Sequence, residues 1–541
     1  MQINFGDIPG QYNLFLDYLY EFDNVKNFYK NNFRNKDEYL KVFKSISETS
    51  REFRNDIPKI ISAQYDGFSP SQKTKDNIDS LKDKNTLAVV TGQQLGILGG
   101  PLYTFYKIIT AIKLSEHLKE RYDAYNFVPV FWLEGDDHDF EEVRSIGILN
   151  ESNSLTNIFY EDEIPDEETR NSVGYLIIKE SINTFFENLE KNLRDTEFKN
   201  NLLNELKTIY APGKSFKKAF KELLFRFFDK HGLIIFDPQD VIIKNLLKPV
   251  FKNEIKNFRK HTEKLVKVSA TLEELYHAQV KVRPVNLFYS TGDGRFLIEP
   301  VENEFRLRRK RKKFTQDEII NEIDMHPENF SPNVLLRPIC QDYILPTAFY
   351  IGGPSEVSYF AQITPLYDFY NLNTPVIYPR ASATIFENNL EKIIEKYNLS
   401  VEDIFTNADD LKTKVINSLT KNSVDDIFAE ANNQVELILD KLKEKLFEFD
   451  KTIADSTGKY RQKILNYLDE LKAKALDAQK KKHETTLRQI DKLTNAIYPN
   501  NNLQERELNF TYYFNKYGEE FIDRIYNELN INSFNHQVIK Y

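Results

Sequence analysis

The fold is decided by residues 87–143, which have the sequence LAVVTGQQLGILGGPLYTFYKIITAIKLSEHLKERYDAYNFVPVFWLEGDDHDFEEV. The first four residues are an apolar run that predicts a buried parallel strand. A glycine-spaced turn over Thr91–Pro101, an amphipathic helix over 102–119 and a second strand over 127–133 are expected to follow. Such a unit is half of a doubly wound sheet, which binds ligands beyond the carboxyl ends of its strands. The polar segment Glu134–Asp139 therefore indicates an active site.

Size and composition narrow the class of protein. A chain of 541 residues predicts two to four structural units, and a net charge of −9 argues against nucleic acid or a membrane as partner. The sequence contains no apolar run of about 18 residues, so no segment is expected to span a membrane. No secretory signal is expected either, because no basic segment followed by an apolar one occurs at the start. The single cysteine, Cys340, is typical of a reducing cytoplasm. Its apolar neighbours favour an inert core thiol over a nucleophile.

Alternating strands and helices extend the sheet beyond residue 143. Residues 9–85 are expected to be helical, and apolar runs at 232–236, 347–351 and 374–378 predict three more strands. The fold class is therefore α/β, with a Rossmann-like doubly wound parallel sheet. Core segments are expected at residues 1–150, 232–285 and 326–385, with insertions at 151–231 and 286–325.

The second insertion has two notable features. Gly292-Asp293-Gly294 lies between apolar runs and predicts a hairpin turn. Residues 306–313 (RLRRKRKK) are the only dense basic run, and they form either a solvated flank of the hairpin or a phosphate clamp. The flank is favoured, because the chain is acidic and no aromatics are interleaved.

Residues 386–499 are expected to form an α-helical coiled coil, and residues 500–541 a helical tail packing on the core. Apolar residues step by three and four from Val435 to Ile453 and again from Ile464 to Ile497. Ser456-Thr457-Gly458 is the predicted break between two helices. The seam pairs within one chain, between two chains, or both.

Several motifs together resemble those of one family over nearly the whole chain. They are Thr91-Gly92-Gln93-Gln94-x-Gly96, Gly100-Pro101-x-Tyr103-Thr104, Pro129–Trp132, Asp137–Glu142, Leu336-Arg337-Pro338, Gly352–Glu356, Tyr378-Pro379-Arg380 and Gln504-Glu505-Arg506. They resemble the bacillithiol biosynthesis cysteine-adding enzymes. The resemblance implies a core similar to class I aminoacyl-tRNA synthetases, with connecting-peptide insertions and a dimerising coiled coil. It also implies a cytoplasmic homodimer that joins L-cysteine to the amine of glucosaminyl malate.

One departure concerns ATP. Class I synthetases handle ATP with His-x-Gly-His and Lys-Met-Ser-Lys-Ser, and neither motif occurs here. ATP as cosubstrate and an adenylate intermediate therefore follow from analogy of fold alone. No metal ion is predicted, because the spacing of the acids around His138 is not diagnostic of Mg²⁺.

Candidate site residues follow from the chemistry of amide formation. His138 is the candidate base, with Asp137 or Asp139 to fix its tautomer; the alternative is an acidic N-cap of the next helix. The glycine loop is expected to hold the activated group at its main-chain N–H groups, and arginines the malate carboxylates. The residues assigned to substrate binding are Thr91, Gly92, Gln93, Gln94, Gly100, Tyr103, Lys107, Trp132, Arg337, Gly353, Glu356 and Arg380.

Two further hypotheses complete the analysis. If the coiled coil folds back on itself, Arg506 would lie beside a helix start at Ser382-Ala383-Thr384, forming a second nucleotide or anion site. The rival to an enzyme is a coiled-coil scaffold or binding protein whose Rossmann-like core only recognises a ligand.

Overall fold

The computed structural model describes residues 1–162, 170–292, 294–419 and 423–541. It divides into two compact units. One comprises Met1–Ile385 and Asn502–Ile539, and the other Phe386–Asn501 and Lys540–Tyr541. None of the helices in these ranges is both long enough and apolar enough to cross a membrane.

The centre of the first unit is a parallel sheet in the order β13-β12-β2-β3-β6. The strands are β2 (Thr86–Gln94), β3 (Asn126–Glu134), β6 (Ile234–Phe236), β12 (Thr347–Gly352) and β13 (Val376–Pro379). The chain proceeds from β2 outward through β3 to β6, then returns to the other side of β2 for β12 and β13. The order reverses between β2 and β12, which confirms the doubly wound, Rossmann-like prediction.

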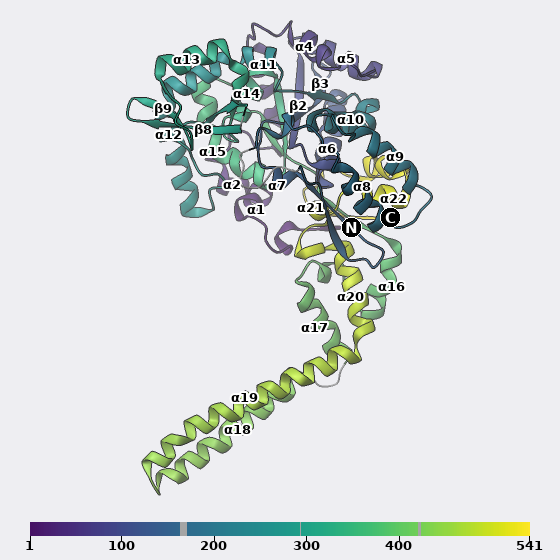
Figure 1. The fold of residues 1–541 in the computed structure, drawn as a ribbon, viewed down its shortest axis with the longest axis vertical. Helices are drawn as coiled ribbons and strands as arrows, with labels where there is room; N and C mark the ends of the chain where they lie inside the picture. The colour runs from purple at the N-terminus through teal and green to yellow at the C-terminus, as the bar shows by residue number, and fades with distance from the viewer. Residues whose placement is uncertain (163–169, 293, 420–422) are drawn as a thin grey trace. The chain divides into compact units, whose positions relative to one another are not determined.

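Helices contact this sheet and bury its strands. The predicted helix after β2 is α6 (Tyr103–Arg121), which packs on β2 and β3, while α3 (Tyr39–Glu48) contacts β2 and β12 (Figure 1). The other helices before β2 are α1 (Asn13–Tyr20), α2 (Phe22–Val25), α4 (Ile57–Gln64) and α5 (Gln72–Ser80). Helices α14 (Arg337–Ile344) and α15 (Pro354–Tyr370) flank β12. All five strands are largely buried, as their apolar runs predict.

The first strand is longer than predicted, and the turn after it is correspondingly shorter. Thr91–Gln94 belong to β2 and pair with β3, because Gly92 lets the two main chains approach: a Cβ at Gly92 would lie 3.0 Å from the main-chain oxygen of Trp132. The turn proper spans residues 95–102. It is folded tightly enough that a Cβ on Gly96 would lie 2.7 Å from the Cα of Gly100.

The two insertions are partly β-structure. An unpredicted antiparallel pair, β4 (Ser145–Leu149) and β5 (Leu155–Phe159), leads from the core into the first insertion, which continues with α8 (Ile182–Asn192), α9 (Lys199–Ile209) and α10 (Phe216–Phe228); residues 163–169 lie outside the described residues. After β6 come α11 (Val241–Leu246) and α12 (Lys248–Leu275). The second insertion is an antiparallel sheet of β7 (Leu287–Thr291), β8 (Gly294–Val301), β9 (Glu304–Leu307), β10 (Lys313–Thr315) and β11 (Phe330–Pro332), with α13 (Gln316–Met325).

The predicted features of the second insertion can be placed. Thr291 pairs with Gly294, as the hairpin prediction requires, although Asp293 itself lies outside the described residues. The basic run 306–313 covers the end of β9, the start of β10 and the turn between them. Most of its charged side chains are exposed. This position is the one expected of a solvated hairpin flank.

The second unit is helical. It contains α16 (Glu391–Tyr397), α17 (Ala408–Leu419), α18 (Val424–Phe447), α19 (Lys451–Lys482) and α20 (Glu484–Ile497). Helices α18 and α19 lie antiparallel, with Asp425 paired to Lys472 and Glu436 to Arg461 (Figure 1). The predicted break at Ser456-Thr457-Gly458 is wrong, since α19 runs through it. The chain reverses at residues 448–450, where Asp450 accepts hydrogen bonds from the first amides of α19.

The end of the chain differs from the prediction. Helices α21 (Gln504–Glu507), α22 (Phe510–Tyr517) and α23 (Glu520–Glu528) are followed by a strand, β15 (His536–Lys540), which pairs with β1 (Gln2–Ile3) and neighbours β14 (Ala383–Phe386). The helix start expected at Ser382-Ala383-Thr384 is therefore wrong. Ser382 precedes β14, and Ala383 and Thr384 lie in it; its neighbour β15 comes from the end of the chain.

Candidate active site

The carboxyl ends of β2 and β3 open into a cavity of about 670 Å³. Gln93, Gln94, Asp137 and His138 all line it, so the glycine-containing strand end and the acid–histidine segment share one cavity, as predicted. Its other predicted lining residues are Gly92, Tyr103, Lys107, Arg337, Gly353, Glu356 and Arg380. The cavity lies at the switch point of the sheet, where doubly wound folds bind ligands.

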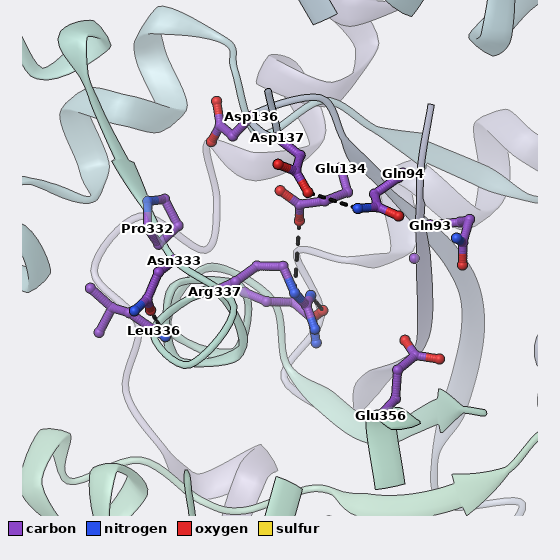
Figure 2. Close-up of polar contacts among 12 residues, drawn as sticks. Gln93, Gln94, Glu134, Asp136, Asp137, Pro332, Asn333, Leu336, Arg337 and Glu356 are labelled. Carbon is purple, nitrogen blue, oxygen red and sulfur yellow. Dashed lines mark hydrogen bonds and ion pairs between the residues drawn. The ribbon is translucent and has the colours of Figure 1, made fainter. Parts of the chain in front are cut away.

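Asp137 is held as an anion at the edge of the cavity. Its carboxylate accepts a hydrogen bond from the side-chain amide of Gln94 (2.7 Å; Figure 2) and another from the main-chain amide of His138 (2.7 Å). Burial opposes its ionisation, but the contacts with His138 and Gln94 and the charge of Arg295 outweigh burial and lower the pKa of Asp137. Gln94 donates equally to Glu142 (2.7 Å), so one amide separates two carboxylates.

The imidazole of His138 faces an arginine. Its Nδ1 lies 3.3 Å from Nη1 of Arg295 and 3.5 Å from Oδ1 of Asp137. Arg295 is fixed by Ser331 and the carbonyl of Pro332, and it stacks on Phe288. Nδ1 therefore lies between a guanidinium, which only donates, and the carboxylate of Asp137, which only accepts.

A buried lysine–glutamate pair forms another wall. Nζ of Lys107 lies 2.5 Å from Glu356 and donates to the carbonyl of Gly92 and the side chain of Gln93. Glu356 also accepts from the amide of Gly353 (2.8 Å) and the hydroxyl of Tyr350 (2.6 Å). Burial opposes the charge on Glu356, but Lys107 and these donors hold its pKa below the usual value. The charged groups of Lys107 and Glu356 are thus already bonded to other residues of the protein.

The two arginines predicted to clamp malate are likewise engaged. Arg337 donates to Gln341 and to the hydroxyls of Tyr350 and Tyr359. Arg380 forms a buried ion pair with Glu505 at 2.6 Å and donates to the carbonyl of its neighbour Ala381. Both reach the cavity with most of their donors already used.

The residues proposed for a second site do not surround Arg506. Ser382 and the main-chain amide of Ala383 donate to Glu505 (2.8 and 3.0 Å), and the hydroxyls of Ser382 and Thr384 each lie 2.8 Å from a ring nitrogen of His536. All three are buried, and Arg506 faces the main cavity instead. Because the expected helix start is absent, its free N–H groups are absent as well.

Four predicted residues do not line the cavity. Thr91 donates to the carbonyl of Ile351 and so joins β2 to β12. Trp132 is buried against Phe236, and Gly100 closes the turn at a φ of 69°. Asp139 is exposed and caps the short helix α7 (Phe140–Val143), which is the N-cap alternative. None of residues 95–102 lines the cavity, so only Gly92–Gln94 of the predicted loop Thr91–Pro101 reach it.

Several lining residues were missed. Glu134 ends β3, Tyr350 and Tyr359 come from β12 and α15, and Lys281, Arg283 and Arg295 enter from the segment that leads into β7 and from β8. Glu134 was detectable as the last residue of a predicted strand. The three cations carried no local pattern, because β8 of the second insertion brings Arg295 to the sheet and the segment between α12 and β7 brings Lys281 and Arg283.

Other groups are not suited to the chemistry. Cys340 is fully buried, and burial raises the pKa of its thiol, as expected of an inert core cysteine. In the described part of the chain, no three His, Cys, Asp or Glu side chains are grouped so as to hold a metal ion.

Comparison with known proteins gives consistent results. Residues 1–381 match the family model of the N-terminal Rossmann-like domain of bacillithiol biosynthesis BshC, and residues 383–541 match that of its C-terminal coiled-coil domain. A protein of Salinibacter ruber is 34% identical over 97% of this chain and 96% of its own. One of Natranaerobius thermophilus is 30% identical over 97% and 96%. Both are named "Putative cysteine ligase BshC".

A solved arginyl-tRNA synthetase-type structure from Campylobacter jejuni aligns with 10% identity over 83% of this chain and 96% of that chain. Its TM-score of 0.21 is too low to support a conclusion about the fold. The two family models together span both units of the chain. The chain belongs to the bacillithiol biosynthesis BshC family.

Proposed function

We propose that this protein is a cysteine ligase that forms an amide between the carboxyl group of L-cysteine and the amine of glucosaminyl malate. The observation that carries the proposal is the single cavity at the carboxyl ends of β2 and β3, which combines carboxylates with cations. Both substrates carry an ammonium and at least one carboxylate, so a site of mixed charge suits them. The name borne by the relatives supports the same activity.

The malate carboxylates would bind to cations that the protein leaves unpaired. Lys281, Arg283 and Arg506 line the cavity, and among the described residues no carboxylate forms an ion pair with any of them. Arginine suits a dicarboxylate because its fork of donors matches carboxylate geometry. His138 lines the same cavity, and its ring N–H would donate to the oxyanion that develops during acyl transfer.

The cysteine carboxyl must be activated before an amine displaces its oxygen. We assign this step to ATP as cosubstrate, because a nucleoside triphosphate can convert a carboxylate into an acyl group with a good leaving group. Quantifying ADP and AMP during turnover tests the assignment: AMP supports an adenylate, ADP an acyl phosphate, and turnover without either nucleotide product removes ATP from the proposal.

Assembly and location complete the proposal. Helices α18 and α19 pair within the chain, yet large apolar side chains on them remain exposed, among them Leu437, Ile438, Leu442, Ile464, Tyr467 and Leu471. We assign these faces to a homodimer contact, and the protein to the cytoplasm. Light scattering of the purified protein tests the dimer.

The activity itself is tested by mass spectrometry. Purified protein is incubated with L-cysteine, glucosaminyl malate and ATP, and each component is omitted in turn. Bacillithiol that forms only in the complete mixture supports the ligase. Tight binding of glucosaminyl malate with no product under any activating condition would favour a ligand-binding scaffold instead.

A further inference from the structure

Glu134 is the one carboxylate of the cavity to which no described residue donates a hydrogen bond. It is the last residue of β3, opposite Gln94 of β2, and its side chain points between Asp137 and Arg337 (Figure 2). Among the described residues, no donor reaches its carboxylate within hydrogen-bond distance, and its Oε2 is buried. By contrast, Asp137 and Glu356 each accept several hydrogen bonds.

The nearest cation does not satisfy Glu134. Nε of Arg337 lies 3.7 Å from Oε2, while both Nη atoms of that arginine donate to Gln341 and to two tyrosine hydroxyls. Burial raises the pKa of Glu134 to about 7. Arg337 opposes this rise, and the neighbouring Asp136 and Asp137 add to it. A carboxylate in this state accepts protons readily at neutral pH.

His138 is held between two charged groups. Its Nδ1 lies 3.3 Å from Nη1 of Arg295, whose guanidinium is held by Ser331 and Pro332, and 3.5 Å from Oδ1 of Asp137. Asp137 is stabilised as an anion by its donors and is therefore a weak base. Of the groups at this strand end, Glu134 is left to accept a proton.

We propose that Glu134 is the general base of the ligation, a role that rests on the cysteine ligase function proposed above. Its carboxylate takes one proton from the ammonium of the acceptor sugar and becomes a carboxylic acid. The freed nitrogen lone pair bonds to the activated carboxyl carbon of cysteine. The bond from that carbon to the activating group, supplied by a nucleoside triphosphate, breaks, and the group leaves with the electron pair. A second nitrogen proton passes to solvent as the amide forms.

The test compares Glu134→Gln with Glu141→Gln, a matched control in which an exposed glutamate outside the cavity, paired with Arg144, is changed. We expect Glu134→Gln to lower kcat by about 100-fold or more, the usual contribution of a general base. KM for glucosaminyl malate should change little, and the acidic limb of the kcat–pH profile near pH 7 should disappear. Glu134→Asp should keep that limb with reduced kcat, and Glu141→Gln should behave as wild type.

A measurement independent of turnover checks that the glutamine variant is folded and titrates as expected. The pKa of Glu134 is higher in the folded chain than its ordinary value of about 4.5. The folded state therefore holds the extra proton between about pH 4.5 and 7, and stability falls as pH rises through this window. Glu134→Gln should raise Tm relative to wild type at pH 8 and much less at pH 5.

The outcomes separate the two proposals. A wild-type protein that forms no bacillithiol overturns the ligase function and the role of Glu134 with it. An active wild type with a Glu134→Gln variant that keeps its kcat or its acidic limb overturns only the role of Glu134, and assigns the limb to the substrate amine or another group. A defect confined to KM would make Glu134 a binding residue and would likewise reject it as the base.

Discussion

The side-chain amide of Gln94, at the end of β2, donates a 2.7 Å hydrogen bond to Asp137, which follows β3. The same nitrogen donates to Glu142 over 2.7 Å. One neutral donor thus joins two strand ends and lies between two carboxylates that would otherwise repel each other. The acidic edge of the cavity depends on this amide.

Replacing Gln94 should disturb that edge. Gln94→Ala removes a donor from two carboxylates, and we expect kcat/KM to fall about tenfold, in line with ~1–2 kcal/mol for a lost hydrogen bond to a charged group. Gln94→Glu should be worse at pH 8 than at pH 6, since three carboxylates would then be ionised together. Steady-state kinetics checks both, with exposed Gln72→Ala as control; equal activity of Gln94→Ala and Gln72→Ala would contradict the prediction.

Malate recognition is assigned to the unpaired cations Arg283 and Arg506. Arg283→Ala and Arg506→Ala should each raise KM for glucosaminyl malate by about tenfold, the effect of ~1.4 kcal/mol of lost binding. An acceptor that lacks the malate carboxylates should show little change between wild type and variants. Arg311→Ala, in the exposed basic run, is the control. A loss of the same size with both acceptors would show that these arginines do not bind malate.

The buried pair of Arg380 and Glu505 should matter for stability. Glu505→Gln leaves the arginine buried with an unpaired charge, and breaking such a pair costs about 3–5 kcal/mol. We expect Tm to fall by several degrees, measured by calorimetry. Exposed Glu528→Gln, which only loses a surface contact with Arg524, serves as the comparison. Equal Tm values for the two variants would mean that the pair contributes little.

His536 should make the protein sensitive to acid. Burial lowers the pKa of His536 to about 4, with Glu505 opposing and Arg380 reinforcing the shift. The unfolded chain binds this proton near pH 6.5, so stability is fully present above that value and declines as pH falls toward 4. His536→Asn should lose less Tm than wild type between pH 7 and pH 5. If exposed His277→Asn flattens the profile equally, the effect does not come from His536.

The sequence was sufficient to predict the central sheet because its strands are continuous apolar runs buried on both faces. Leu87–Val90 and 127–133 could be recognised in this way, and the polar residues after them located the cavity. The strand β15 could not be recognised, because His536–Lys540 is short and acquires its role only by pairing with β1 and lying beside β14. The helix break predicted at Ser456–Gly458 was wrong, because an exposed helix tolerates a glycine at a modest cost in stability.

The site was only half predictable for a related reason. Residues at the carboxyl ends of β2 and β3 lie together by topology, so Gln93, Gln94 and Asp137–His138 could be assigned to one edge. Arg295 reaches that edge from β8 of a separate antiparallel sheet, and Arg283 from the segment that leads into that sheet. Arg337 and Arg380 could be recognised because they belong to two of the family motifs. Their buried partners, Tyr350, Tyr359 and Glu505, are evident only in the folded chain.

A crystal structure with glucosaminyl malate bound tests the central claim most directly, namely that one cavity at the carboxyl ends of β2 and β3 holds the acceptor for ligation. The sugar amine should lie within hydrogen-bond distance of Glu134, and a malate carboxylate should contact Arg283 or Arg506. Glucosaminyl malate bound elsewhere on the protein, or in this cavity with its amine directed away from Glu134 and its carboxylates away from both arginines, would contradict the account.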